Sequence, residues 1–124
     1  MIVVDGMNVV GARPDGWWRD RRAAMVALVE RLETLAASDG ERMTVVFDGR
    51  PFDLSPIGAS VEVRFASRSG PNAADDDIVD LVAAADRPAE LRVVTSDGDL
   101  AERVRSLGAG VVGAGELRRR LDAL

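Results

Sequence analysis

Carboxylate side chains follow three apolar, strand-like segments of this sequence. The acids at these positions are Asp5, Asp48, Asp97 and Asp99. In an open parallel α/β sheet the carboxyl ends of the strands share one edge, and ligands bind in the crevice beyond it. Because neighbouring strands lie about 4.8 Å apart, the acids are expected within one or two strand spacings of each other. The sequence therefore predicts a cluster of carboxylates at one edge of a sheet.

Such a cluster points to a bound metal ion. Carboxylates that crowd together raise one another's pKa unless a cation lies among them. The chain has no histidine and no cysteine, so its ligands would all be oxygen atoms, which select hard ions such as Mg²⁺ or Mn²⁺. A bound ion of this kind lowers the pKa of a water molecule and polarises a phosphoryl oxygen. The expected chemistry is hydrolysis by metal-activated water.

The missing residue types exclude several other mechanisms. Histidine, cysteine, tyrosine and lysine are all absent. The chain therefore cannot build a Ser-His-Asp or Cys-His triad, a histidine-based zinc site, a Schiff base or a phosphate-loop lysine. Carboxylates, hydroxyls, arginines and backbone amides remain for catalysis.

Asp75 is expected to join the cluster from a helix. The acidic run Asp75-Asp76-Asp77 opens a segment whose apolar residues recur with helical spacing. At about 100° per residue, Asp75 lies near the centre of the apolar stripe, whereas Asp76 and Asp77 turn more than 90° away from it. Asp75 should therefore point toward the sheet edge, where a buried carboxylate needs a compensating positive charge.

Each acid also has a purely structural interpretation, as part of a helix cap. Asn72 would cap the helix that contains Asp75, with Asp75 as the capping-box acid. Ser96 would likewise cap the following helix, with Asp99 three residues further on. Convergence of the acids in space distinguishes a metal site from these separate caps.

Strand-like and helix-like segments alternate along the rest of the chain. Apolar residues at helical spacing predict a long helix from near Trp17-Trp18 to Gly40, a glycine suited to end it. Val61 to Phe65 alternates with period two, as a half-buried strand does, and Val111-Val112 is a short last strand before a final helix. The predicted loops are Val9 to Gly16 and Phe52 to Ser60. The pattern indicates a single α/β domain over residues 1–124 with a mostly parallel central sheet of about four to five strands.

All sixteen basic residues are arginines, and the formal net charge is −5. An acidic balance is unusual for a nucleic-acid-binding protein, because its affinity comes largely from neutralising phosphates. Two divalent cations in the acid cluster would reduce the negative charge by four. Arginine suits bidentate phosphate contacts. The arginines expected near the acid edge are Arg13, Arg50, Arg64 and Arg68.

Two further groups of arginines lie on helices. Arg19, Arg21 and Arg22 fall in the first turns of the long helix, where cations are unfavourable. They form either a solvated face or a set of phosphate contacts. The triplet Arg118 to Arg120 in the final helix is predicted to be a solvated face.

The sequence favours a cytoplasmic location. No run of about 18 apolar residues is present, so no membrane span is expected. The chain starts Met1-Ile2-Val3-Val4-Asp5, without the basic and apolar regions of a signal peptide. The lack of cysteine is compatible with a reducing compartment.

Four short motifs resemble a known family. They are Asp5-Gly6-Met7-Asn8-Val9, Val46-Phe47-Asp48, Ala74-Asp75-Asp76-Asp77-Ile78 and Thr95-Ser96-Asp97-Gly98-Asp99-Leu100. In this order they resemble the NYN branch of the PIN-like nucleases, and most closely its YacP-like group. The resemblance covers nearly the whole chain. It departs from the family at Met7, which stands where a tyrosine is usual.

This resemblance implies a three-layer α/β/α fold and hydrolysis of RNA with Mg²⁺ or Mn²⁺ as cofactor. Its expected partner is RNA, alone or within a ribosome or a larger RNA-processing complex. The positions that match the family's catalytic, metal-holding acids are Asp5, Asp48, Asp75 and Asp97. The positions that match supporting ligands are Asp99 and Asp76. Asn8 matches a polar contact to metal or substrate, and Ser96 either contacts phosphate or caps a helix.

Other proteins that gather carboxylates fit the sequence less well. A haloacid-dehalogenase-like phosphatase uses Mg²⁺ and a motif similar to Ser96-Asp97-Gly98-Asp99, but its first strand ends in Asp-x-Asp, and Met7 occupies the second acidic position here. A response-regulator receiver needs a lysine, and a topoisomerase-primase-like domain needs a glutamate where Asp5 stands. The main alternative is a non-catalytic module of the same fold that docks RNA or a ribosome-associated partner.

Overall fold

Strands and helices follow one another along the chain in the computed structural model, which describes residues 1–54, 58 and 60–124. The elements are β1 (Ile2–Asp5), α1 (Gly6–Gly11), η1 (Trp17–Arg19), α2 (Arg21–Asp39), β2 (Met43–Phe47), β3 (Val61–Phe65), α3 (Ala73–Ala83), η2 (Pro88–Glu90), β4 (Arg92–Val94), α4 (Gly98–Ser106), β5 (Gly110–Val112) and α5 (Ala114–Asp122). The loop predicted from Phe52 to Ser60 lies partly outside the described residues. No helix among the described residues is both long and apolar enough to cross a membrane.

The five strands form one parallel sheet in the order β3-β2-β1-β4-β5. β1 is central and pairs with β2 on one side and β4 on the other. All strands therefore end at the same edge of the sheet, and the predicted α/β class with a mostly parallel sheet is confirmed.

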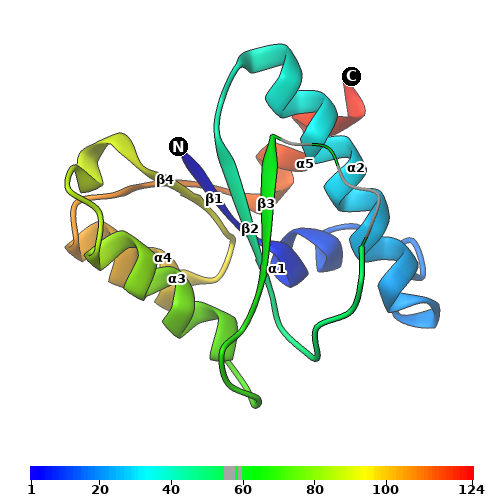
Figure 1. Ribbon diagram of the computed structural model, residues 1–124, viewed down its shortest axis with the longest axis horizontal. Coiled ribbons are helices and arrows are strands. Elements are labelled where there is room, and N and C mark those ends of the chain that lie inside the picture. Colours follow the sequence, from blue (N-terminus) through cyan, green and yellow to red (C-terminus); the bar gives the residue numbers. More distant parts are fainter. Residues whose placement is uncertain (55–57, 59) are drawn as a thin grey trace.

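Helices cover both faces of the sheet, which gives three layers (Figure 1). α1, α2 and α5 pack on one face and α3 and α4 on the other. Alternate strand residues enter the two cores: Val4 faces the first group of helices, and Val3 faces the second. Because both faces of β1 and β2 are buried, these two strands read as nearly continuous apolar runs.

The loop predicted for Val9 to Gly16 is wrong at its start, because Gly6–Gly11 forms the short helix α1. Val9 and Val10 are fully buried, so packing against α2 and α5 holds a six-residue segment that would not be helical alone. The guanidinium of Arg118 donates from Nε to the carbonyl of Val9 at 3.0 Å.

The long helix ends where the sequence predicts, but it starts three to four residues later than predicted. Gly40 ends it with φ 66°, the left-handed conformation that glycine adopts without strain. The helix α2 starts at Arg21, where Asp20 accepts a hydrogen bond from the backbone N–H of Ala23 at 3.0 Å. Trp17–Arg19 forms a separate 3₁₀ turn, η1.

The helix α1 can approach the sheet closely because residue 6 has no side chain. A Cβ atom at Gly6 would overlap the ring of Phe47 and lie 3.0 Å from Cγ2 of Val45. Both neighbours are fully buried, so neither can move aside at low cost. We expect Gly6→Ala to lower the free energy of unfolding by about 1–3 kcal/mol, as overpacking does, measured by urea denaturation.

A matched control for this substitution is Gly115→Ala in α5. A Cβ atom there meets only the end of the Arg119 side chain at 3.6 Å. Alanine is the better helix former by about 1 kcal/mol, so this variant should be as stable as the wild type or more stable. Equal destabilisation by the two substitutions would contradict the close approach at Gly6.

Candidate functional site

Asp5 ends the central strand β1 and lies at the middle of the site. It shares the face of the sheet with Val3, two residues earlier, and therefore faces the α3 and α4 side. Its side chain is only 4% exposed. The hydroxyl of Thr95, at the end of β4, donates to Oδ2 of Asp5 at 2.8 Å.

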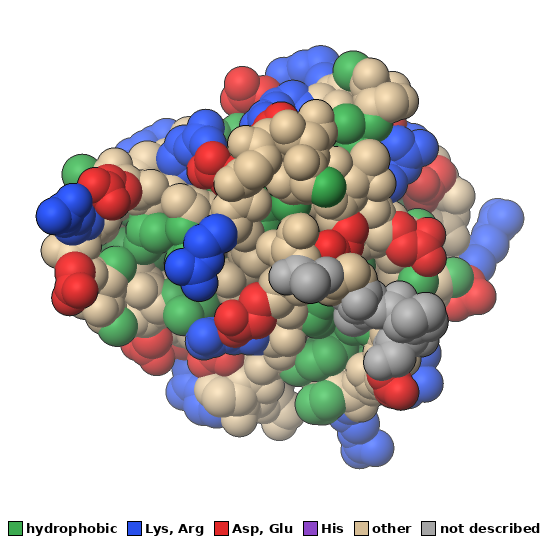
Figure 2. Space-filling view, turned by 45° about the horizontal axis from the view of Figure 1, so that its top comes forward, with side chains coloured by type: hydrophobic (Ala, Val, Ile, Leu, Met, Phe, Trp, Pro, Cys, Tyr) green, Lys and Arg blue, Asp and Glu red, His purple; other side chains and the backbone are tan. Residues whose placement is uncertain are grey.

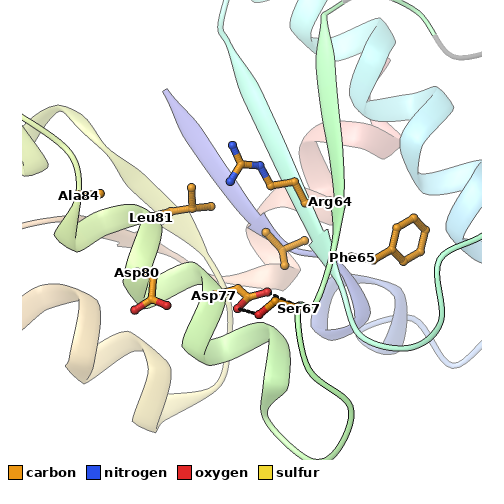
Figure 3. A pocket seen from close by; sticks show the side chains of 8 residues that line it. Arg64, Phe65, Ser67, Asp77, Asp80, Leu81 and Ala84 are labelled. Atoms are coloured by element: carbon orange, nitrogen blue, oxygen red, sulfur yellow. Dashed lines mark hydrogen bonds between the residues drawn. The ribbon is translucent and has the colours of Figure 1, made fainter.

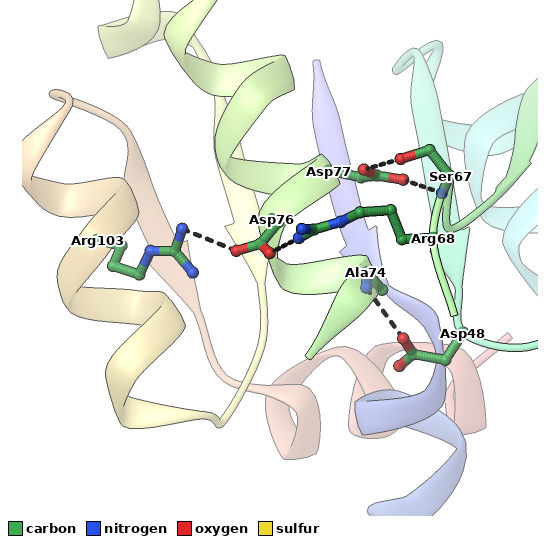
Figure 4. Close-up of polar contacts among 7 residues, drawn as sticks. All are labelled: Asp48, Ser67, Arg68, Ala74, Asp76, Asp77 and Arg103. Atoms are coloured by element: carbon green, nitrogen blue, oxygen red, sulfur yellow. Dashed lines mark hydrogen bonds and ion pairs between the residues drawn. The ribbon is translucent and has the colours of Figure 1, made fainter. Parts of the chain in front are cut away.

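Asp48 follows β2 and connects that strand to α3. Its Oδ1 accepts a hydrogen bond from the backbone N–H of Ala74 at 2.9 Å (Figure 4). The prediction that Asn72 caps this helix is wrong: Asn72 has φ 61° and its side chain makes no capping bond. The carboxylate of a distant strand caps the helix instead, which the local pattern does not reveal.

Asp97 follows β4 and is the N-cap of α4. Its Oδ1 accepts from the backbone N–H groups of Asp99 at 2.9 Å and Leu100 at 3.1 Å. The predicted capping role of Ser96 in this helix is therefore wrong. The Ser96 hydroxyl oxygen instead accepts from the N–H of Ala114, the first residue of α5, at 2.9 Å.

The electrostatics show that the four acids predicted to be catalytic lie in one region. Burial, together with the charges of Asp75, Asp48 and Asp97, raises the pKa of Asp5 to about 6, although the hydrogen bond from Thr95 opposes the increase. Burial likewise raises the pKa of Asp75, helped by Asp97 and Asp48. These carboxylates come from β1, β2, α3 and α4, so the structure brings them together rather than onto separate sides.

The acids do not form a closed cage for an ion. Among the described residues, no three acidic groups lie close enough to ligate one metal together. Mg²⁺ keeps several waters in most sites and is held by one or two carboxylates plus substrate phosphates. The donor set of carboxylate oxygens around Asp5 fits that open form of binding.

Asp76 is engaged in two ion pairs. Its carboxylate pairs with Arg68, from the segment after β3, and with Arg103 on α4, the latter at 3.1 Å (Figure 4). Asp77 accepts from the backbone N–H and hydroxyl of Ser67, at 2.6 and 2.8 Å. Asp99 is exposed in the first turn of α4, and its charge raises the pKa of Asp75.

Asn8 and Met7 have structural contacts in α1. The side-chain oxygen of Asn8 accepts from the backbone N–H of Ser96 at 2.8 Å, which ties α1 to the end of β4. Met7 is partly buried against the core under α1, α2 and α5. Position 7 therefore faces the layer opposite to the carboxylates.

Seven of the sixteen arginines form ion pairs with other described residues. Arg13 pairs with Asp122 at the end of α5, and Arg64 pairs with Glu62 on the same strand. Arg50 is exposed, lies two residues after Asp48 and forms no ion pair with any described residue. The prediction that Arg118 to Arg120 form a solvated face is wrong for two of these residues. Arg120 pairs with Asp39 at 2.6 Å, and Arg118 is partly buried.

Figure 2 shows acidic and basic side chains interspersed on one face rather than a single basic field.

Sequence reasoning missed the role of Thr95. This residue is 1% exposed, and its hydroxyl both donates to Asp5 and accepts from the backbone N–H of Asp97 at 3.1 Å. A polar residue that ends an apolar strand, two positions before a candidate acid, is the signal that could have revealed it. Thr95 fixes the orientation of Asp5 relative to α4.

A hollow of about 500 Å³ lies beside the acids but is separate from them. It is lined by residues of β3 and α3, among them Arg64, Asp77, Asp80 and Leu81 (Figure 3). None of the four candidate catalytic acids lines it. The four carboxylates therefore lie outside this hollow.

Comparison with known proteins identifies the family. A family model described as the YacP-like NYN domain matches residues 2–124. The crystal structure of Rae1 (YacP) from Bacillus subtilis is similar at 26% identity and a TM-score of 0.82, with 99% of this chain and 74% of that chain covered. A mutant of the same Bacillus subtilis protein matches at 27% identity and a TM-score of 0.79, over 98% of this chain and 74% of that one. Among curated proteins, none matches the sequence. The chain belongs to the YacP-like NYN domain family, within the PIN-like nuclease superfamily.

Proposed function

We propose that this protein is a metal-dependent ribonuclease that hydrolyses phosphodiester bonds within RNA chains. The observation that carries the proposal is a carboxylate, Asp5, buried at the end of the central strand among three other acids, with its pKa raised to about 6. Carboxylates this close repel one another when no cation lies among them. A divalent cation bound among them would compensate their negative charge.

The residues divide into ion ligands and positioning groups. Asp5, Asp75, Asp97 and Asp48 are the carboxylates from which Mg²⁺ or Mn²⁺ would take one or two direct ligands, with water and substrate phosphates supplying the others. When bound, the ion supplies an activated water and stabilises charge on the phosphoryl oxygens. Thr95 holds the Asp5 carboxylate in one orientation, and the cap made by Asp97 fixes its side chain relative to α4.

The open form of the site supports cleavage inside a chain. Asp99 is exposed and Asp48 and Asp97 are half-buried, so the acids reach the surface along an edge. An edge can accept a strand that continues in both directions, whereas a closed pocket would select a chain end. RNA is the proposed substrate on the strength of the family.

Cleavage assays test the proposal directly. Pure protein is incubated with single-stranded and structured RNA in Mg²⁺, in Mn²⁺ and in excess chelator. We expect internal cleavage with either ion and none with chelator. Cleavage that persists in chelator would contradict metal dependence.

A binding module of the same fold is the second candidate, because no three acids in the described part of the chain are preorganised around one ion. Such a module would bind RNA or a ribosomal complex without cutting it. RNA binding at normal affinity, with no cleavage of any RNA in either ion, would favour it over the nuclease.

Metal binding should also stabilise the fold. A ligand that binds only the folded state at 100 times its Kd adds about 2.7 kcal/mol, which corresponds to roughly 10 °C in Tm for a chain of this size. We expect a rise of this order on addition of saturating Mg²⁺ or Mn²⁺, measured by calorimetry. KCl at the same ionic strength is the control, and an equal rise with KCl would contradict a specific site.

A further inference from the structure

An exposed tryptophan and four arginines lie where η1, α2 and the segment after β2 meet. We name this the Trp18 surface, and it consists of Trp18, Arg19, Arg21, Arg22 and Arg50. Trp18 is 59% exposed, the largest value among the exposed large hydrophobic side chains described. All four arginines are exposed as well. An aromatic face surrounded by cations is the composition of a single-stranded nucleic-acid site.

The Trp18 surface contacts the segment that contains Asp48, one of the candidate acids. The guanidinium of Arg21 donates to the backbone carbonyl of Asp48 at 3.1 Å. Arg22 stacks over the ring of Phe52 at 4.7 Å, and Phe52 packs on Phe65 at 5.6 Å. These contacts hold the start of α2 against the segment that follows Asp48.

The arginines of the Trp18 surface form no ion pair with any described residue. Seven arginines elsewhere form ion pairs, but Arg19, Arg21, Arg22 and Arg50 form none with any residue that the structure describes. The nearby Asp20 is engaged as the N-cap of α2. Cations at a helix N-terminus oppose the helix dipole, and no ion pair with a described residue offsets that cost here. An external anion would offset it.

Trp18 is held as a stable platform. Its ring meets that of Trp17 edge to face, with centroids 6.0 Å apart and an interplanar angle of 86°. Trp17 is half-buried and packs against the core under α1 and α2. The inner tryptophan therefore anchors the outer one, and an exposed side of the Trp18 ring system is available for stacking.

We propose that the Trp18 surface binds the stretch of single-stranded RNA next to the cleaved bond. One unpaired base stacks on Trp18, and Arg21, Arg22 and Arg50 contact backbone phosphates. A base is free to stack on a side chain only where it is unpaired, so the surface selects single-stranded over double-stranded RNA. The choice of RNA as ligand rests on the proposed function.

Binding without catalysis tests this inference independently of cleavage. The probe is a fluorescein-labelled single-stranded RNA, followed by anisotropy in excess chelator so that no cutting occurs. We expect Trp18→Ala to weaken binding about 10-fold or more, in line with the energy of base stacking on aromatic residues, and Trp18→Phe to restore part of it. The double variant Arg21→Ala with Arg22→Ala should weaken binding and make it less salt-dependent.

Arg105→Ala is the matched control, because Arg105 is exposed near the end of α4 and likewise has no ion pair among the described residues. It removes one positive charge away from the site and should leave affinity and salt dependence unchanged. An RNA duplex of the same sequence should bind equally to wild type and Trp18→Ala. Wild-type affinity in the Trp18 and arginine variants, or equal losses in Arg105→Ala, would overturn the inference.

Failure of this inference is distinguishable from failure of the proposed function. If wild-type protein cleaves RNA and the Trp18 variants retain its KM, the inference is wrong and the nuclease stands. If no RNA is cleaved but the Trp18 variants lose binding, the surface stands and the nuclease is wrong.

Discussion

Asp97→Asn is expected to abolish metal-dependent cleavage of RNA and to leave the protein as stable as the wild type. Asparagine retains the side-chain oxygen that accepts from the N–H groups of Asp99 and Leu100, and it is as good an N-cap as aspartate. Only the charge is lost. Removal of a metal ligand charge costs several kcal/mol of transition-state stabilisation, so the rate should fall by at least about 10³-fold.

Two comparisons make the Asp97 experiment specific. Asp86→Asn removes one negative charge from an exposed residue at the opposite edge of the sheet and should leave activity unchanged. Asp97→Ala removes the cap as well and should lose about 1 kcal/mol of stability. Undiminished cleavage by purified Asp97→Asn would assign the activity to another protein in the preparation and would contradict the proposed site.

Asp5→Asn is expected to make the metal-free protein more stable while removing its activity. The folded-state pKa of Asp5 is about 6, against an ordinary value of 3.8, so the folded protein binds this proton more tightly than the unfolded chain. The stability that the proton contributes is complete below about pH 4 and is lost as the pH rises through 6. Above that pH, asparagine avoids a penalty of about 3 kcal/mol.

Paired urea denaturations across pH measure this effect. With chelator present, the stability gain of Asp5→Asn over wild type should be near zero below pH 4 and should grow to about 3 kcal/mol above pH 7. With saturating Mg²⁺ the gain should shrink or reverse, since the ion stabilises only the wild-type carboxylate. A stability gain that does not change with pH would show that folding does not raise the pKa of Asp5.

Sequence patterns predicted the sheet and the convergence of the acids for a definite physical reason. Parallel strands buried on both faces read as apolar runs, and their common direction brings the following residues to one edge. The position of Asp75 followed from helical geometry, since one residue of an acidic run shares the direction of the apolar stripe. These features depend only on local periodicity and on strand direction.

Features that depend on contacts between distant segments could not be predicted in this way. The helix α1 exists because Val9 and Val10 are buried between other elements. The caps of α3 and α5 come from Asp48 and Ser96, which lie 26 and 18 residues away along the chain. A local capping rule assigns such roles to the nearest polar residue. Here it selects Asn72, whose side chain makes no capping bond, and assigns Ser96 to α4 instead of α5.

The hydrogen bonds at the sheet edge use only one oxygen of each carboxylate. Oδ2 of Asp5 accepts from the Thr95 hydroxyl. Oδ1 of Asp48 and Oδ1 of Asp97 accept from backbone N–H groups at the N-termini of α3 and α4. The described residues contain no buried side-chain oxygen without a hydrogen-bond partner, so the second oxygen of each acid is reached by solvent. An ion that binds as proposed would therefore exchange with water at these atoms without breaking any of these hydrogen bonds. Loading and release of the ion would then be limited by its hydration shell and not by movement of the protein.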